Sequence, residues 1–127
     1  MRYLLSSDLD SYLQMSELVA RSEYVTKNIV VAVASQNEIY DNITASKAAD
    51  TLLSMNDIEA AFVITKQREQ EISINARSTG NINVQRIMEK LGGGGHFSNA
   101  ATQIKDKSVE NVRKMLINEL KQLNEKE

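Results

Sequence analysis

Four consecutive glycines and the single histidine of the chain form the segment with the clearest chemical potential. Gly92–Gly95 are followed directly by His96. Glycine loses more conformational entropy on folding than other residues, so a run of four requires a compensating role. Successive N–H groups in such a loop can form an anion-binding nest, and a helix beginning at Ser98–Ala101 would add its own N–H groups and dipole. The segment predicts an anion site with His96 as a further donor; a flexible loop with a surface histidine is the alternative.

Arg77 is the second candidate for binding an anion. The alternation of apolar and polar residues over 71–77 places Arg77 on the polar face at the end of a strand, with Asn75 on the same face. Arginine can contact a phosphate through two hydrogen bonds, and Ser78 adds a hydroxyl and a backbone N–H. A solvated arginine at a strand end is the alternative. Phe97, which follows the histidine, either stacks on a base or belongs to the core.

Composition excludes several classes of protein. The 127 residues are enough for one domain, and the absence of cysteine excludes disulfides and thiolate chemistry. With one histidine, the chain lacks the grouped histidines and aspartates of a di-metal hydrolase site. The net charge of −2 argues against binding long duplex DNA, which requires a basic face. No apolar run approaches the ~20 residues that span a bilayer.

The pattern of polar and apolar residues predicts the helices and strands that hold these candidate residues in place. Ser7, Asn83 and Ser108 are expected to cap helices. The expected helices cover 7–22, 44–55, 84–91 and 109–123, and the expected strands cover 28–35, 60–65, 71–77 and 102–104. Strands separated by helices imply parallel pairs, and a hairpin of 60–65 with 71–77 adds an antiparallel pair. The predicted fold class is therefore α/β, with a mixed β-sheet of about four to five strands and helices packed on it.

Three motifs resemble those of a known family. Asn75-Ala-Arg-Ser78, Gly93-Gly-Gly-His96 and Asn99-Ala-Ala101, with a short helix between the first two, resemble the DHHA1 domain. That domain is the C-terminal half of DHH superfamily phosphoesterases, which include RecJ-type exonucleases and nano-RNase/pAp phosphatases. The resemblance extends from about Tyr24 to Leu123.

Finer details narrow the resemblance to one group. Residues 87–96 and 99–104 are most similar to the C-terminal domain of GdpP/YybT-type cyclic-di-AMP phosphodiesterases. Thr102 stands where many family members have glycine, and Asn75 stands where many have serine. The resemblance divides the chain into an N-terminal helix or linker segment, 1–23, and a DHHA1-like substrate-binding domain, 24–127.

The resemblance also implies a set of functional residues. In the family, a preceding DHH domain holds two Mn²⁺ ions and activates water, and the DHHA1 domain binds the phosphate or nucleotide of the substrate. This implies that the present chain has no catalytic residue, metal ligand or cofactor of its own and is inactive alone. The implied substrate-binding residues are Arg77, Ser78, Gly93, Gly94, Gly95, His96 and Asn99.

The expected function is that of a nucleotide- and phosphate-binding C-terminal domain, whose parent protein hydrolyses cyclic-di-AMP to pApA. Two alternatives stay open: a module that binds short single-stranded nucleic acid, as in RecJ or nano-RNase relatives, and a mainly structural or dimerising domain. The expected partners are a cyclic dinucleotide or short oligonucleotide, the DHH domain of the same parent chain, and a second copy in a homodimer. We expect a cytoplasmic domain cut from a membrane-anchored parent.

Overall fold

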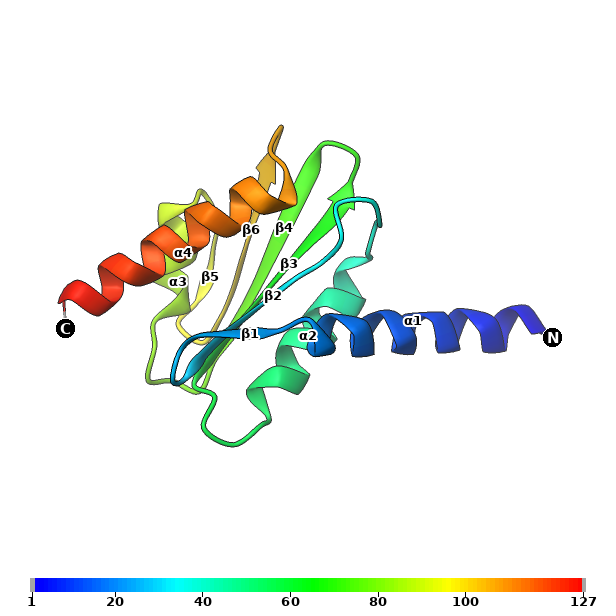
Figure 1. Ribbon diagram of the computed structural model, residues 1–127, viewed down its shortest axis with the longest axis horizontal. Coiled ribbons are helices and arrows are strands. Elements are labelled where there is room, and N and C mark those ends of the chain that lie inside the picture. The colour runs from blue at the N-terminus through cyan, green and yellow to red at the C-terminus, as the bar shows by residue number, and fades with distance from the viewer. Residues whose placement is uncertain (1, 127) are drawn as a thin grey trace.

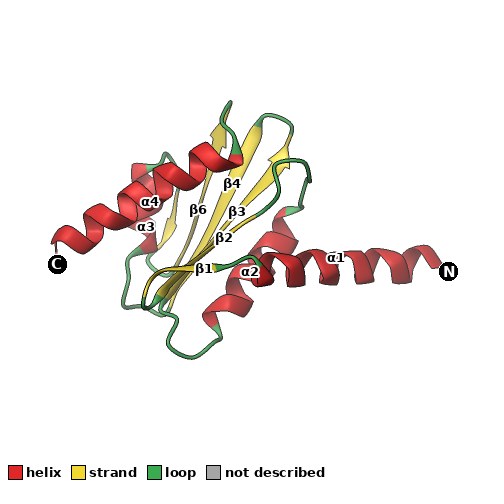
Figure 2. Ribbon diagram, viewed as in Figure 1, coloured by secondary structure: helices red, strands yellow, loops and turns green. Residues whose placement is uncertain are grey.

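The computed structural model describes the backbone of residues 2–126 and the side chains of residues 9–122. Four helices and one six-stranded sheet make up this part of the chain (Figures 1 and 2). In chain order, they are α1 (Arg2–Ala20), β1 (Glu23–Thr26), β2 (Ile29–Val33), α2 (Asn42–Leu53), β3 (Ala60–Arg68), β4 (Glu71–Ser78), α3 (Val84–Lys90), β5 (Gly94–His96), β6 (Asn99–Lys105) and α4 (Val109–Lys126). The strand order is β1-β2-β3-β4-β6-β5.

The sheet is mixed. Strands β2 and β3 are parallel, because α2 lies between them in the chain, and the other neighbouring pairs are antiparallel. Helices α1 and α2 cover one face, called the α2 face below, and helices α3 and α4 cover the other, called the α4 face (Figure 1). No helix within residues 2–126 is long and apolar enough to cross a membrane.

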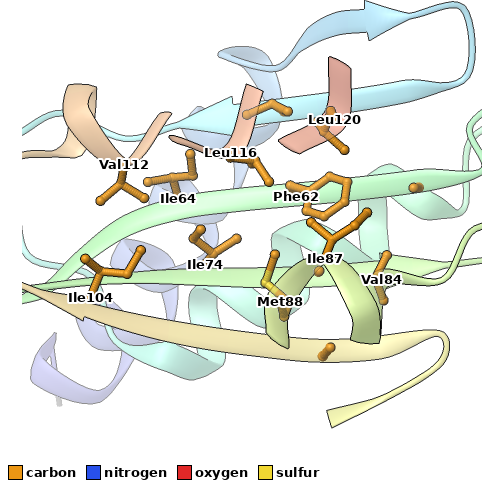
Figure 3. Packing of buried hydrophobic residues seen from close by; sticks show 14 of the residues in the cluster. Phe62, Ile64, Ile74, Val84, Ile87, Met88, Ile104, Val112, Leu116 and Leu120 are labelled. Carbon is orange, nitrogen blue, oxygen red and sulfur yellow. The ribbon is translucent and has the colours of Figure 1, made fainter. Parts of the chain in front are cut away.

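The alternation of side chains along β3 and β4 supplies both faces of the core. Phe62 and Ile64 of β3 face α4, where they meet Leu116 and Leu120, and α3 adds Met88 to the same cluster (Figure 3). These side chains are fully buried, and burying each stabilises the fold by roughly 1.5–3 kcal/mol. On the α2 face the helix contributes small residues, which bring it close to the sheet. These are the fully buried Ala45, Ala48 and Ala49.

The predicted mixed α/β sheet is confirmed, but it has six strands rather than four to five. The additional strands are β1 and β5, neither of which has an apolar alternation that the sequence could show. β5 consists of glycines and a histidine that pair with β6. The predicted helix start at Ser98–Ala101 is wrong, because β6 begins at Asn99 and extends the strand expected over 102–104.

The first helix also differs from its prediction. It begins at Arg2, so Ser7 lies inside the helix and does not cap it, since arginine and leucine at the preceding positions favour helix. Its C-terminal half packs on the α2 face through Met15, Leu18 and Val19. The proposed division of the chain at residue 23 stays a prediction. The caps at Asn83 and Ser108 are confirmed by side-chain oxygens that accept backbone N–H groups.

Tyr40 fastens α1 to the body of the protein. Its side chain is fully buried, and its hydroxyl lies 3.1 Å from Glu17 Oε1 on α1 and 3.2 Å from Glu38 Oε1. Gln14 of α1 donates to the other oxygen of Glu38 at 3.2 Å. Burial raises the pKa of the Tyr40 phenol far above its usual value, and the two carboxylates raise it further.

We expect this phenol to make the protein sensitive to alkaline pH. Because its pKa is raised in the folded state, the phenol contributes stability below about pH 10, where unfolded tyrosine is still neutral, and this contribution is lost as pH rises further. Tyr40→Phe should therefore lose less free energy of unfolding between neutral and strongly alkaline pH than the wild type. Urea unfolding at successive pH values measures this difference, and equal alkaline losses in the two proteins would contradict it.

Candidate functional site

Arg77, Asn99 and His96 lie side by side across three strands. Arg77 of β4 is directly opposite Asn99 of β6, and Asn99 is directly opposite His96 of β5. Residues directly opposite in antiparallel strands point to the same face, with Cβ atoms about 5 Å apart. The pairing therefore gathers one guanidinium, one amide and one imidazole into a continuous line, called the Arg77 row below.

The Arg77 row lies on the α2 face, where the sheet is only partly covered. Helix α2 packs over β3 and β4, and β6 and β5 extend beyond it. Both His96 and Asn99 are exposed. Along the strands, the next cross-strand line on this face is Asn75, Ala101 and Gly94. A Cβ built on Gly94 meets no atom within 4 Å, so the surface beside the row is open.

Two hydrogen bonds hold the side chain of Arg77 in place. Its Nε donates to Asp50 Oδ1 of α2 at 3.0 Å, and its Nη1 donates to the carbonyl of Ala76 at 3.0 Å. The side chain is 13% exposed, whereas that of Asp50 is 62% exposed. Among the described residues, the Nη2 group of the guanidinium has no hydrogen-bond partner. The Asp50 carboxylate stays exposed to water, so it orients the Arg77 side chain while its own negative charge remains solvated.

Ser78 lies elsewhere. It pairs with Ala60 in the sheet and is buried, with its hydroxyl donating to the carbonyl of Ile82 at 2.7 Å and accepting the N–H of Gly80 at 3.2 Å. Its backbone N–H donates to the carbonyl of Ser98 at 2.9 Å. The structure therefore does not bring the Ser78 hydroxyl into the Arg77 row; Ser78 shapes the turn after β4 and ties it to the β5–β6 hairpin.

The glycines have separate roles, and they do not form the expected nest. The N–H of Gly92 donates to Glu89, at 3.1 Å, and the N–H of Gly93 donates to Met88, at 2.8 Å, so both close the end of α3. A Cβ on Gly93 would lie 2.2 Å from the carbonyl oxygen of Ala101. Gly95 has φ +141°, and a Cβ added there would lie 2.5 Å from the Cα of Ala100. A Cβ would meet open space at both Gly92 and Gly94, but Gly92 has φ +93°, so of the four glycines only Gly94 combines open space with an ordinary φ.

Sequence reasoning missed the polar stripe on α2. Asn42, Ser46 and Asp50 are spaced four residues apart, so they share one side of the helix. The Asn75 amide donates to Asn42 Oδ1 at 3.2 Å, and Ser46 Oγ donates to Asn75 Oδ1 at 3.4 Å. Polar residues at this spacing beside buried alanines were a visible pattern, but nothing in the sequence paired them with β4.

A cleft lies on the other side of the molecule from the Arg77 row. This cleft of about 810 Å³ is lined by residues of α1, β2 and the start of α4, including Arg21 and Arg113. Arg21 is bound to the carbonyl of Val33, and Arg113 pairs with Glu23 and Glu110. The residues of the Arg77 row do not line this cleft. Over the described residues, no three His, Cys, Asp or Glu side chains are grouped to hold a metal ion.

The family model and the related sequences that match this chain agree with one another. Residues 26–124 match the model of the DHHA1 domain. The chain is 47% identical over 113 residues to the cyclic-di-AMP phosphodiesterase PdeA of Listeria monocytogenes serotype 1/2a (strain 10403S), covering 89% of this chain and 17% of that protein. It is 43% identical over 107 residues to the cyclic-di-AMP phosphodiesterase GdpP of Bacillus subtilis (strain 168), covering 83% of this chain and 16% of that protein. The chain thus spans about one sixth of these relatives.

Two further matches are another related sequence and a solved structure. A membrane protein-large ribosomal subunit bL9 fusion protein of Aster yellows witches'-broom phytoplasma (strain AYWB) is 36% identical over 118 residues, which cover 92% of this chain and 14% of that protein. Among solved structures, an exopolyphosphatase-related protein from Bacteroides fragilis aligns with a TM-score of 0.71 at 19% identity, over 89% of this chain and 36% of that chain. The structural match shows a shared fold.

Alanine substitutions should separate the structural glycines from the open one. Gly93→Ala places a methyl group against the backbone of β6 and should cost roughly 1–3 kcal/mol of unfolding free energy. Gly94→Ala meets open space at an ordinary φ, so its stability should stay within about 0.5 kcal/mol of the wild type. Thermal and urea unfolding measure both. A Gly94→Ala loss as large as that of Gly93→Ala would show that the surface beside the row is not open.

Proposed function

Because this chain belongs to the DHHA1 domain family, we propose that it is the nucleotide-binding domain of a DHH-family phosphodiesterase, whose parent protein hydrolyses cyclic-di-AMP to pApA. The relatives named above as cyclic-di-AMP phosphodiesterases support the choice of substrate. The observation that carries the proposal is the Arg77 row, which aligns three side chains capable of donating hydrogen bonds and runs from the half-buried Arg77 to the exposed Asn99 and His96.

In this proposal, the row holds a phosphate of the nucleotide. The Nη2 group of Arg77 donates to one phosphate oxygen in a charge-assisted hydrogen bond, and Asn99 and His96 donate to others. Asp50 keeps the guanidinium aimed, so little side-chain entropy is lost on binding. The missing side chain at Gly94 lets the ligand approach the backbone of β5. These contacts bind and orient the ligand and stabilise charge on its phosphate oxygens.

Cleavage itself is assigned to another domain. Hydrolysis of a phosphodiester needs an activated water, which Mn²⁺ bound to a DHH domain of the same parent chain would supply. The grouped carboxylates and histidines that hold such ions are not found among the described residues of this chain. We therefore propose that this chain alone binds nucleotide without hydrolysing it. We also propose a membrane-anchored parent with this domain on the cytoplasmic side; a relative named as a membrane protein supports the membrane anchor.

The main test compares two arginines on opposite faces of the sheet. Arg77→Ala removes the charge-assisted hydrogen bonds of the row and should weaken pApA binding at least about tenfold. Arg77→Lys keeps the charge but not the planar fork, so its affinity should lie between those of the wild type and Arg77→Ala. Arg113→Ala is the control, since this arginine is also paired with carboxylates but lies in the cleft on the other side. Isothermal titration calorimetry gives the dissociation constants.

Several outcomes would overturn the assignment. Unchanged pApA affinity in Arg77→Ala, with the fold intact by circular dichroism, would remove the row from the site. A loss confined to Arg113→Ala would move the site to the cleft beside α4. Tighter binding of a single-stranded ten-nucleotide DNA than of pApA, with a steep salt dependence, would favour the nucleic-acid module instead.

A further inference from the structure

The polar stripe of α2 borders the open surface beside the Arg77 row. Asn42 is exposed, Ser46 is partly exposed, and both are bonded to Asn75 of β4, which is 2% exposed. Asn75 is directly opposite Ala101, and Ala101 is directly opposite Gly94. A wall that carries amide and hydroxyl groups therefore stands beside a floor whose side chains are no larger than a methyl group.

The distance between this floor and the Arg77 row suits a nucleotide. The two cross-strand lines are two residues apart along β4, which is about 7 Å in a strand. This is close to the span of the sugar that joins a phosphate to its base. A nucleotide whose phosphate lies on the row can thus place its flat base over Ala101 and Gly94, with one edge toward Asn42.

The hydrogen bonds around Asn75 use one lone pair of the Asn42 oxygen. Ser46 donates to the Asn75 carbonyl oxygen, and the Asn75 amide nitrogen donates to Asn42 Oδ1. Among the described residues, the amide nitrogen of Asn42 has no hydrogen-bond partner, and its oxygen keeps a second lone pair. One donor and one acceptor side by side match adenine, whose N7 accepts and whose N6 amino group donates. The corresponding edge of guanine has two acceptors, N7 and O6, and leaves the Asn42 oxygen without a partner.

We propose that Asn42, oriented by the buried Asn75, reads an adenine base that lies on the floor formed by Ala101 and Gly94. The inference rests on the proposed function, because it takes the phosphate position from the Arg77 row. It adds a specificity-determining residue on α2, an element that the three sequence motifs do not include. Asn75 is a positioning residue in this arrangement, since it acts through Asn42.

The test measures base preference separately from phosphate binding. Dissociation constants for pApA, pGpG and ribose 5-phosphate are compared in the wild type, Asn42→Ala and Asn111→Ala. Asn111 is the control because it is an exposed asparagine in the first turn of α4, on the opposite face. The wild type and Asn111→Ala should prefer pApA to pGpG, and Asn42→Ala should reduce that preference about tenfold while ribose 5-phosphate binding stays unchanged.

The outcomes distinguish the two proposals. If Arg77→Ala abolishes binding of ribose 5-phosphate but Asn42→Ala leaves the pApA to pGpG ratio unchanged, the phosphate row stands and the adenine subsite is wrong. If Asn42→Ala weakens the binding of pApA, pGpG and ribose 5-phosphate equally, Asn42 stabilises the fold or contributes to phosphate binding. That result also overturns the adenine subsite. If Arg77→Ala changes none of the three affinities, the proposed function fails, and the adenine subsite fails with it.

Discussion

The candidate site depends on the register of three antiparallel strands. Because side chains alternate between the faces of a sheet, a slip of one residue between β4 and β6 would move Asn99 to the opposite face from Arg77. The α4 face guards against such a slip, since Ile74 and Ala76 must stay buried there. Beyond the sheet, Thr102 donates to the last turn of α3 at Leu91, and Ser78 donates to Ser98. Packing on the α4 face thus fixes the positions of the Arg77 row on the α2 face.

The glycine segment shows how this constraint extends to the edge of the sheet. Glycine is required at positions 93 and 95 because the backbone of β6 comes too close there for a side chain. The entropy that these residues lose on folding is offset by the hydrogen bonds of the α3 cap and of the β5–β6 pair. His96 gains its place in the row from this hairpin, because its cross-strand partner is Asn99.

Much of this arrangement could be predicted from the sequence. The alternation over 71–77 was enough to place Arg77 and Asn75 on one face. Ser78 was expected to add its hydroxyl beside Arg77, but as the next residue of the strand it points to the opposite face. The pairing of β5 could not be predicted, because glycines carry no apolar pattern. Nor could the contacts of Asp50 with Arg77 and of Asn42 with Asn75, since they join residues 27 and 33 positions apart. Local sequence patterns define elements, whereas long-range contacts arise only when the elements pack.

The central claim is that ligand binds to the α2 face over β4, β6 and β5. The most direct measurement is a titration of the isotope-labelled protein with pApA, followed through the backbone amide resonances by NMR. If the ligand binds there, saturable shifts are expected at Arg77 and over 94–99, with smaller shifts at the start of α2. Shifts confined to the cleft around Arg21 and Arg113, or no shifts at millimolar pApA, would contradict it.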